Sequence, residues 1–118
     1  MLEIRTTFTP FKMKLTRREP VTLFVEMTNI GDSKEIVSFD VDLGNYLSFE
    51  KGGFKTTNSD RIMEFNPGQS KKYYLDIWPK QVTNAGEATI MLKATEHYGN
   101  LNYVKKKYEK ALKLSIDE

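Results

Sequence analysis

The chain has 118 residues, with 18 Lys and Arg against 16 Asp and Glu, a formal net charge of +2, and no cysteine. This length suits one domain, residues 1–118, that can bury a core without covalent cross-links. The lack of cysteine excludes disulfides, thiolate zinc sites and cysteine nucleophiles. A dedicated nucleic-acid binder usually carries a dominant basic charge, so we expect no nucleic-acid partner.

The N-terminal residues do not read as a signal peptide, because no basic region precedes an apolar run. No apolar stretch approaches the roughly 18 residues of a membrane span, and we expect no insertion into a membrane. The compartment stays open. The chain is either a complete cytoplasmic protein or a domain of a longer, extracellular one.

Period-two alternation of apolar and polar residues runs through the first half of the chain and predicts β-strands. The alternating segments are 2–8, 21–28 and 37–43, and a short edge strand is expected near 46–49. Residues 56–60 read as a loop.

The second half continues the pattern, with strands predicted at 62–65, 71–78 and 88–95. Residues 103–113 are rich in good helix formers, so a helix is the alternative there. The clean alternation at the end of the chain favours a strand over that helix.

Seven or so strands with turn signals between them predict an all-β fold. The specific expectation is an immunoglobulin-like, two-sheet antiparallel β-sandwich of about seven strands. The middle apolar residue of each strand should lie at the centre of the core. These residues are Val25, Phe39, Leu75, Ile77, Ile90 and Leu92.

The segment Pro20–Gly31, with the sequence PVTLFVEMTNIG, resembles the second strand of immunoglobulin-like extracellular modules. The later turn 67–70 (PGQS), Pro79 at a strand end and Gly86 before the next strand follow in a similar order. This order resembles the CARDB (cell-adhesion-related) domain family and the accessory sandwich domain of some alpha-galactosidases. Those families are non-catalytic, so the resemblance implies a role in binding, adhesion or spacing.

His97 is the only histidine. General-base or metal chemistry needs a convergent partner; none is evident, and we expect an exposed loop histidine. Asp40 and Asp42 share one strand face, but calcium wants roughly six or more oxygen ligands. We expect both to face Lys93 on a neighbouring strand, with Lys113 beyond it. The sequence therefore predicts no catalytic residue, no metal site and no cofactor.

The densest basic run lies near the C-terminus. It could contact nucleic acid or a membrane surface, or its lysines could block pairing at a sheet edge. The low net charge favours the edge interpretation. The run comprises Lys105, Lys106, Lys107, Lys110 and Lys113.

Phe24, Tyr74 and Trp78 occupy the outward positions of strong strands. The strands 21–28 and 71–78 are neighbours in an immunoglobulin-like topology, so the three rings should share one outer face. Clustered exposed aromatics mark interaction surfaces, and Tyr and Trp are favoured anchors. We therefore predict these three as binding residues.

An alternative is that residues 9–15 or the 44–60 loop cover the rings as a second small core. The leading interpretation of the whole chain is a non-catalytic immunoglobulin-like module for protein interaction, adhesion or spacing, with a protein partner or self-association. A carbohydrate-binding module with an aromatic platform is the first rival. A small hydrolase using Asp40, Asp42 or His97 is the second, and it needs a concave pocket that holds two of them.

Overall fold

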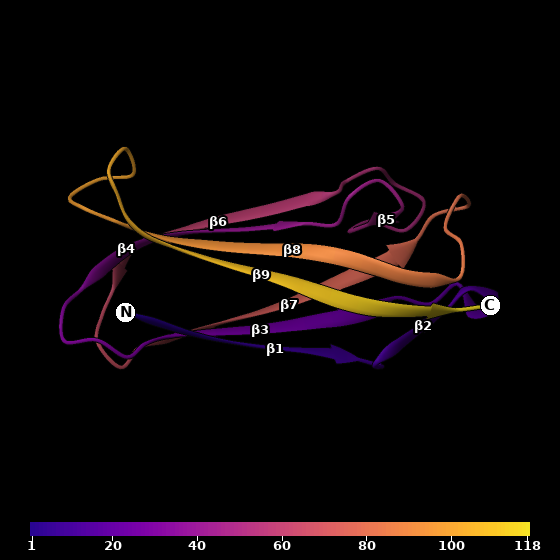
Figure 1. Cartoon of the computed structure of the whole chain (residues 1–118), viewed down its shortest axis with the longest axis horizontal. Coiled ribbons are helices and arrows are strands. Elements are labelled where there is room, and N and C mark those ends of the chain that lie inside the picture. The colour runs from indigo at the N-terminus through magenta and orange to yellow at the C-terminus, as the bar shows by residue number, and fades with distance from the viewer.

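The alternating segments pair into two β-sheets that pack face to face in the computed structural model, which describes residues 1–118 (Figure 1). The all-β, two-layer expectation is confirmed. There are nine strands, more than the seven expected, and a single turn of 3-10 helix, η1 (Leu15–Arg17). The strands are β1 (Leu2–Thr9), β2 (Lys12–Lys14), β3 (Val21–Asn29), β4 (Glu35–Asp42), β5 (Leu47–Ser48), β6 (Thr57–Phe65), β7 (Ser70–Pro79), β8 (Gly86–His97) and β9 (Val104–Asp117).

One sheet has four strands in the order β1-β3-β7-β5, and the other has five in the order β2-β9-β8-β4-β6. All pairs are antiparallel except one, since β2 runs parallel to the end of β9. The molecule is elongated, with extents of 47 × 24 × 19 Å, and the termini lie at opposite ends (Figure 1).

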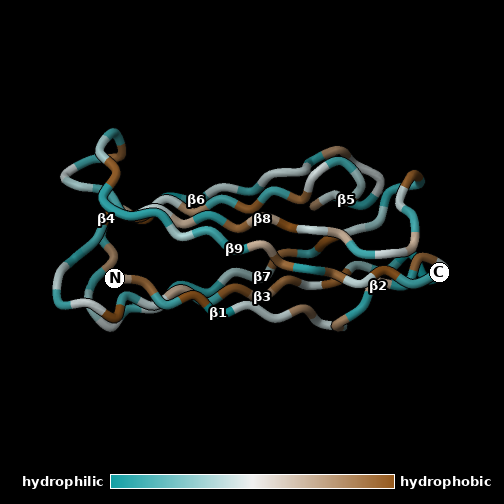
Figure 2. The backbone as a smooth tube through the Cα atoms, in the orientation of Figure 1, coloured by the Kyte–Doolittle hydropathy of each residue, from teal (hydrophilic) through white to brown (hydrophobic).

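The strand pattern of β3 illustrates how the sequence creates the two layers. Its residues alternate strictly between buried and half-buried from Val21 to Asn29. The same alternation of hydropathy is visible along the other central strands (Figure 2). Each strand thus turns one face to the opposite sheet and one face to solvent, which is how a sandwich buries its apolar side chains.

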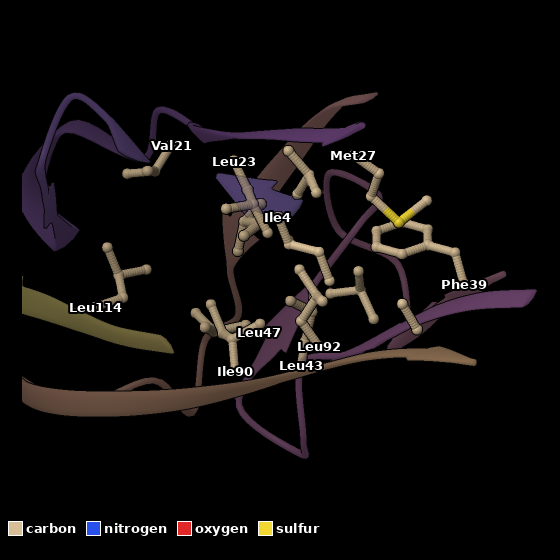
Figure 3. Packing of buried hydrophobic residues seen from close by; sticks show 14 of the residues in the cluster. Ile4, Val21, Leu23, Met27, Phe39, Leu43, Leu47, Ile90, Leu92 and Leu114 are labelled. Atoms are coloured by element: carbon tan, nitrogen blue, oxygen red, sulfur yellow. The ribbon is translucent and has the colours of Figure 1, made fainter. Parts of the chain in front are cut away.

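The core is one cluster of 19 buried residues drawn from both sheets. Ile4 and Leu23 come from the four-stranded sheet, and Met27 points toward the ring of Phe39 across the interface (Figure 3). Five of the six residues predicted at the centre of the core are buried to 0% exposure: Val25, Phe39, Ile77, Ile90 and Leu92.

Leu75, the sixth, is only half-buried. Its strand β7 is nearly a sheet edge, because β5 pairs only with Trp78 and Pro79. Leu75 therefore lacks a neighbouring strand on one side, and its placement at the centre of the core was wrong.

β6 contradicts the loop expected at 56–60, since it pairs with β4 from Thr57 onward. Its half-buried positions include the polar residues Asn58 and Asp60. The Tyr73 hydroxyl donates to the Asp60 carboxylate at 2.7 Å, which gives the latter a partner. An edge strand with polar residues at its inner positions lacks the apolar alternation that predicts a strand, so this segment read as a loop.

The C-terminal segment is a strand throughout β9, so the preference for strand over helix is confirmed. β2 covers only residues 115–117 of β9, and the lysine run lies on the uncovered part. Side chains from this part reach the edge of β1. Tyr108 Oη accepts a hydrogen bond from the Leu2 amide at 3.1 Å, and Lys110 Nζ donates to the Ile4 carbonyl at 2.7 Å. These contacts close one side of the sandwich.

Asn29 ties the two sheets together at the end near the N-terminus. Its side chain is fully buried, and its Nδ2 donates to the carbonyls of Ser33 and Phe65, each at 2.9 Å. Its Oδ1 accepts from the Gly31 amide at 3.0 Å. Its backbone carbonyl accepts from Gly68 at 2.7 Å.

The different burial of two leucines gives a test of the register. Replacing Leu92 with Ala should lower the free energy of unfolding by about 2–5 kcal/mol, because the side chain is fully buried. Leu75→Ala should cost clearly less. Lys93→Ala is the matched surface control and should change stability by less than about 0.5 kcal/mol. Urea denaturation measures all three, and equal losses at both leucines would contradict this packing.

Candidate functional site

The predicted aromatic face lies on the outside of the four-stranded sheet. Phe24 on β3 pairs in register with Tyr74 on β7, and their ring centroids are 5.1 Å apart with a tilt of 39° between the planes. Phe24 is half-buried, whereas Tyr74 remains 69% exposed. The structure therefore brings these two predicted residues together on an accessible surface.

Trp78, the third predicted residue, is separated from this pair along β7. A hydrogen-bonded polar pair lies between them, in which Thr22 Oγ1 donates to Asp76 at 2.7 Å. Trp78 pairs with Ser48 of β5, and Lys51 Nζ lies 5.6 Å from the centroid of its ring. Part of the 44–60 segment thus lies against Trp78.

Matched polar groups surround the Phe24–Tyr74 pair. Lys72 Nζ lies 3.9 Å from a Glu26 carboxylate oxygen, and the hydroxyls of Thr28 and Ser70 are 2.8 Å apart. These contacts repeat the cross-strand register and give the polar groups on either side of the aromatic pair a partner on the neighbouring strand. At the centre of this face, the outer side of the Tyr74 ring has no partner within the chain.

Asp40 lies opposite Lys93 in register, as expected, but its ion pair is with another residue. Arg61 Nη1 of β6 lies 3.7 Å from Asp40 Oδ1, and the Ser59 hydroxyl donates to the same oxygen. The Asp42 carboxylate accepts from the Gly44 amide at 2.9 Å. The expected position opposite Lys93 is therefore confirmed for Asp40, whereas Asp42 lies opposite Met91 and its placement was wrong. The ion-pair partner of Asp40 comes from β6, which read partly as a loop.

Lys113, expected beyond Lys93, instead donates to the Thr89 hydroxyl at 2.7 Å. No group of three or more Asp, Glu, His or Cys residues is arranged to hold a metal ion.

Calcium should leave the melting temperature unchanged, because Asp40 and Asp42 already have protein donors and too few oxygen ligands surround them. Thermal unfolding with and without added calcium measures this. The double variant Asp40→Asn with Asp42→Asn serves as the control. A calcium-dependent rise that the double variant lacks would contradict the assignment.

His97 is buried, with 8% exposure, so the expectation of an exposed loop histidine was wrong. Its Nε2 lies 2.8 Å from the hydroxyl of Ser38, 59 positions away in the sequence, and its Nδ1 has no hydrogen-bond partner. A β-bulge between Glu96 and His97 shifts the register at this point. A nucleophilic serine needs access to substrate and a base oriented by a third group. Ser38 is itself only 8% exposed, so it lacks access to substrate. No third group orients the imidazole of His97.

Two buried carboxylates lie at the end near the N-terminus, and the sequence reasoning did not single them out. Glu35 and Glu96 are 4% and 2% exposed. The Met1 ammonium lies 3.0 Å from Glu96 Oε1, and Lys105 Nζ lies 2.8 Å from Glu35 Oε1. Tyr108 donates its hydroxyl to Glu96 at 2.7 Å. Both glutamates occupy inward positions of alternating strands, and this phase is the signal that could have identified them.

Burial alone would raise the pKa of the Glu96 carboxyl. The hydrogen bond from Tyr108 and the nearby Met1 ammonium outweigh it, and the pKa lies below its usual range. Burial first, and then the bond to Glu96, raise the pKa of the Tyr108 hydroxyl. Ionised Glu96 therefore stabilises the folded state.

A carboxyl with a lowered folded-state pKa contributes stability above its unfolded pKa, and this contribution is lost as the pH falls through the folded value. We expect stability to decline on acidification below the usual glutamate pKa of 4.5. Glu96→Gln should flatten this decline and lower stability at neutral pH by about 1–3 kcal/mol. Urea denaturation over a pH series measures it, with exposed Glu109→Gln as the control. An unchanged pH slope in Glu96→Gln would contradict the role of Glu96.

No protein-family model and no curated protein matches this sequence. Among solved structures, the chain is similar to one described as "the Putative ApaA Protein from Bordetella pertussis". The identity is 13% and the TM-score is 0.46, over 98% of this chain and 92% of that one. None of the helical segments has the length and apolar character needed to cross a membrane.

Proposed function

We propose that this protein is a non-catalytic, immunoglobulin-like module for protein interaction, and that its contact surface is the outer face of the four-stranded sheet around Phe24 and Tyr74. The observation that carries the proposal is the Tyr74 ring, which is 69% exposed and lies against Phe24 on the outer face of the four-stranded sheet.

The strand order supports the immunoglobulin-like assignment. In immunoglobulin-like sandwiches, strands A, B, E and D form one sheet and C, F and G the other. Assigning β1, β3, β7 and β5 to A, B, E and D, and β4, β8 and β9 to C, F and G, reproduces that order. The sequence resemblance to CARDB modules is in line with this assignment, and the Asn29 turn and the Gly68 turn that carry the resemblance are joined by a hydrogen bond.

The surroundings of Tyr74 fit a protein-binding anchor. Binding hot spots are enriched in tyrosine and are ringed by groups that exclude water while contributing little energy themselves. Here the ring is flanked by the Glu26–Lys72 ion pair and the Thr22–Asp76 hydrogen bond. Polar groups that are already paired need no partner of their own when a second surface covers them.

Carbohydrate binding takes second place because of the ring geometry. A sugar platform wants coplanar exposed rings, whereas Phe24 is half-buried and tilted by 39° from Tyr74. Trp78, which would have extended the platform, lies beyond Asp76 with a lysine over its ring. Protein contact needs only one prominent side chain, which Tyr74 supplies.

A photo-cross-linking residue placed at position 74 tests the proposal in cells that naturally make this protein. We expect cross-links to protein, either a second copy or another chain. The same residue at position 113, exposed on the outside of the other sheet, is the matched control and should give none. Circular dichroism establishes that both variants fold. Cross-links that are absent at 74, or equal at both positions, would sink the proposed surface.

Cross-links to glycan in place of protein would favour the carbohydrate alternative. Tyr74→Lys should leave stability within about 0.5 kcal/mol of the original, because the side chain is exposed. The same change should remove association with the partner identified by cross-linking. A Tyr74→Lys variant that unfolds would mean that the ring belongs to a second core.

A further inference from the structure

At the end of the sandwich opposite Asn29, three loops surround an open hollow of about 620 Å³. They follow η1, β5 and β7 in the chain, and they contribute Arg18, Lys51 with Phe54, and Lys80. Trp78 forms part of its wall. The apolar part of the lining is unusually accessible, since Phe54 is 86% exposed and Val82 is 59% exposed.

The charges in this hollow are of one sign. Arg18, Lys51 and Lys80 line it, with no acidic residue among the lining residues. None of the three forms an ion pair anywhere in the structure. The smaller hollow of about 280 Å³ is different, because Glu19 and Asp117 line it and Lys12 pairs with Asp117 at 3.7 Å. The larger hollow thus has three lining cations without an ion-pair partner, and the nearby Glu50 carboxylate lies against Gly53 without pairing with any of them.

Neutral partners hold the three cations in place. Lys80 Nζ donates to the Asn45 carbonyl at 3.0 Å and lies 5.8 Å from the centre of the Phe54 ring. Arg18 donates from Nη1 to the Lys80 carbonyl at 3.2 Å. Lys51 lies over Trp78. These contacts position the cations without neutralising them, so carboxylates can still bind.

We propose that this hollow binds an acidic peptide segment of a partner protein, one that carries carboxylates alongside apolar side chains. The carboxylates would meet Arg18, Lys51 and Lys80, and an apolar side chain would lie on Val82 beside the edge of the Phe54 ring. The three cations come from three different loops and each has its own neutral neighbour, which suits charges spaced along a chain better than one compact anion. This site is separate from the Tyr74 surface and does not rest on it.

A single-stranded nucleic acid is the other polyanion with flat groups, and the rings argue against it. Proteins that bind single strands offer free aromatic faces on which bases stack. Here Lys51 and Lys80 each occupy a position over the Trp78 or Phe54 ring. A carboxylate can bind these ammonium groups where they are, whereas a stacking base would have to displace them.

Trp78 is the only tryptophan in the chain, so its fluorescence reports on this hollow directly. The probe is a short synthetic peptide that alternates Asp with Phe and has no Trp or Tyr. We expect a saturable change in Trp78 emission that weakens as salt rises. Fluorescence anisotropy of the labelled peptide gives the affinity independently of Trp78.

Lys51→Glu should weaken binding by about tenfold or more, because it turns an attraction into a repulsion. Lys51 makes no hydrogen bond or ion pair, so this variant should fold normally. Lys113→Glu changes the net charge equally at a distant site and should bind like the original chain. Tyr74→Lys should also bind normally, which separates this site from the proposed contact face.

The proposal is overturned if the acidic peptide gives no anisotropy change, or if Lys51→Glu and Lys113→Glu weaken it equally. A matched peptide with Lys in place of Asp should not bind, and binding by that peptide would count against the charge argument. Oligothymidylate that binds more tightly than the acidic peptide would reassign the hollow to nucleic acid and end this proposal.

Discussion

The buried side chain of Asn29 is the constraint on which the rest of this sandwich depends. A buried amide is costly unless its donors and acceptor are used, and here two carbonyls and one amide proton satisfy them. Because Phe65 belongs to one sheet and Asn29 to the other, this amide fixes how the sheets meet. The Asn29 carbonyl also accepts from Gly68, which holds a positive φ of 79° that glycine adopts without strain.

The two ends of the sandwich use their polar groups differently as a result. At the Asn29 end, Glu35 and Glu96 are buried and engaged by Lys105, Tyr108 and the N-terminal ammonium. At the other end, β3 begins and β7 finishes in loops that carry cations with neutral neighbours only. A ligand that binds at this second end would meet cations that form no ion pair within the fold.

The sequence was most informative where apolar residues alternate on central strands. There it predicted five of the six expected core residues and the pairing that joins Phe24 with Tyr74. It was least informative at edges and bulges. β6 keeps Asp60 at an inner position because Tyr73 supplies a hydrogen-bond partner for it across the sandwich. His97 is buried through a bulge and a serine 59 positions away, and local sequence carries no trace of either.

The hollow could not be predicted from the sequence, because its residues come from three loops that only the closure of the sandwich brings together. Trp78 lies at the boundary between the sheet face around Tyr74 and the loops around the hollow. Its outward phase was predicted, yet its position at the end of β7 places it beside the β5 loop and Lys51 rather than beside Tyr74. The outward phase of a residue on a strand therefore decides which face of the sheet it lies on. Its position along the strand decides whether its neighbours are sheet residues or the loops at the strand's end. The same rule explains why Tyr74, in the middle of β7, has only paired strand residues around it, and why unpaired cations surround Trp78.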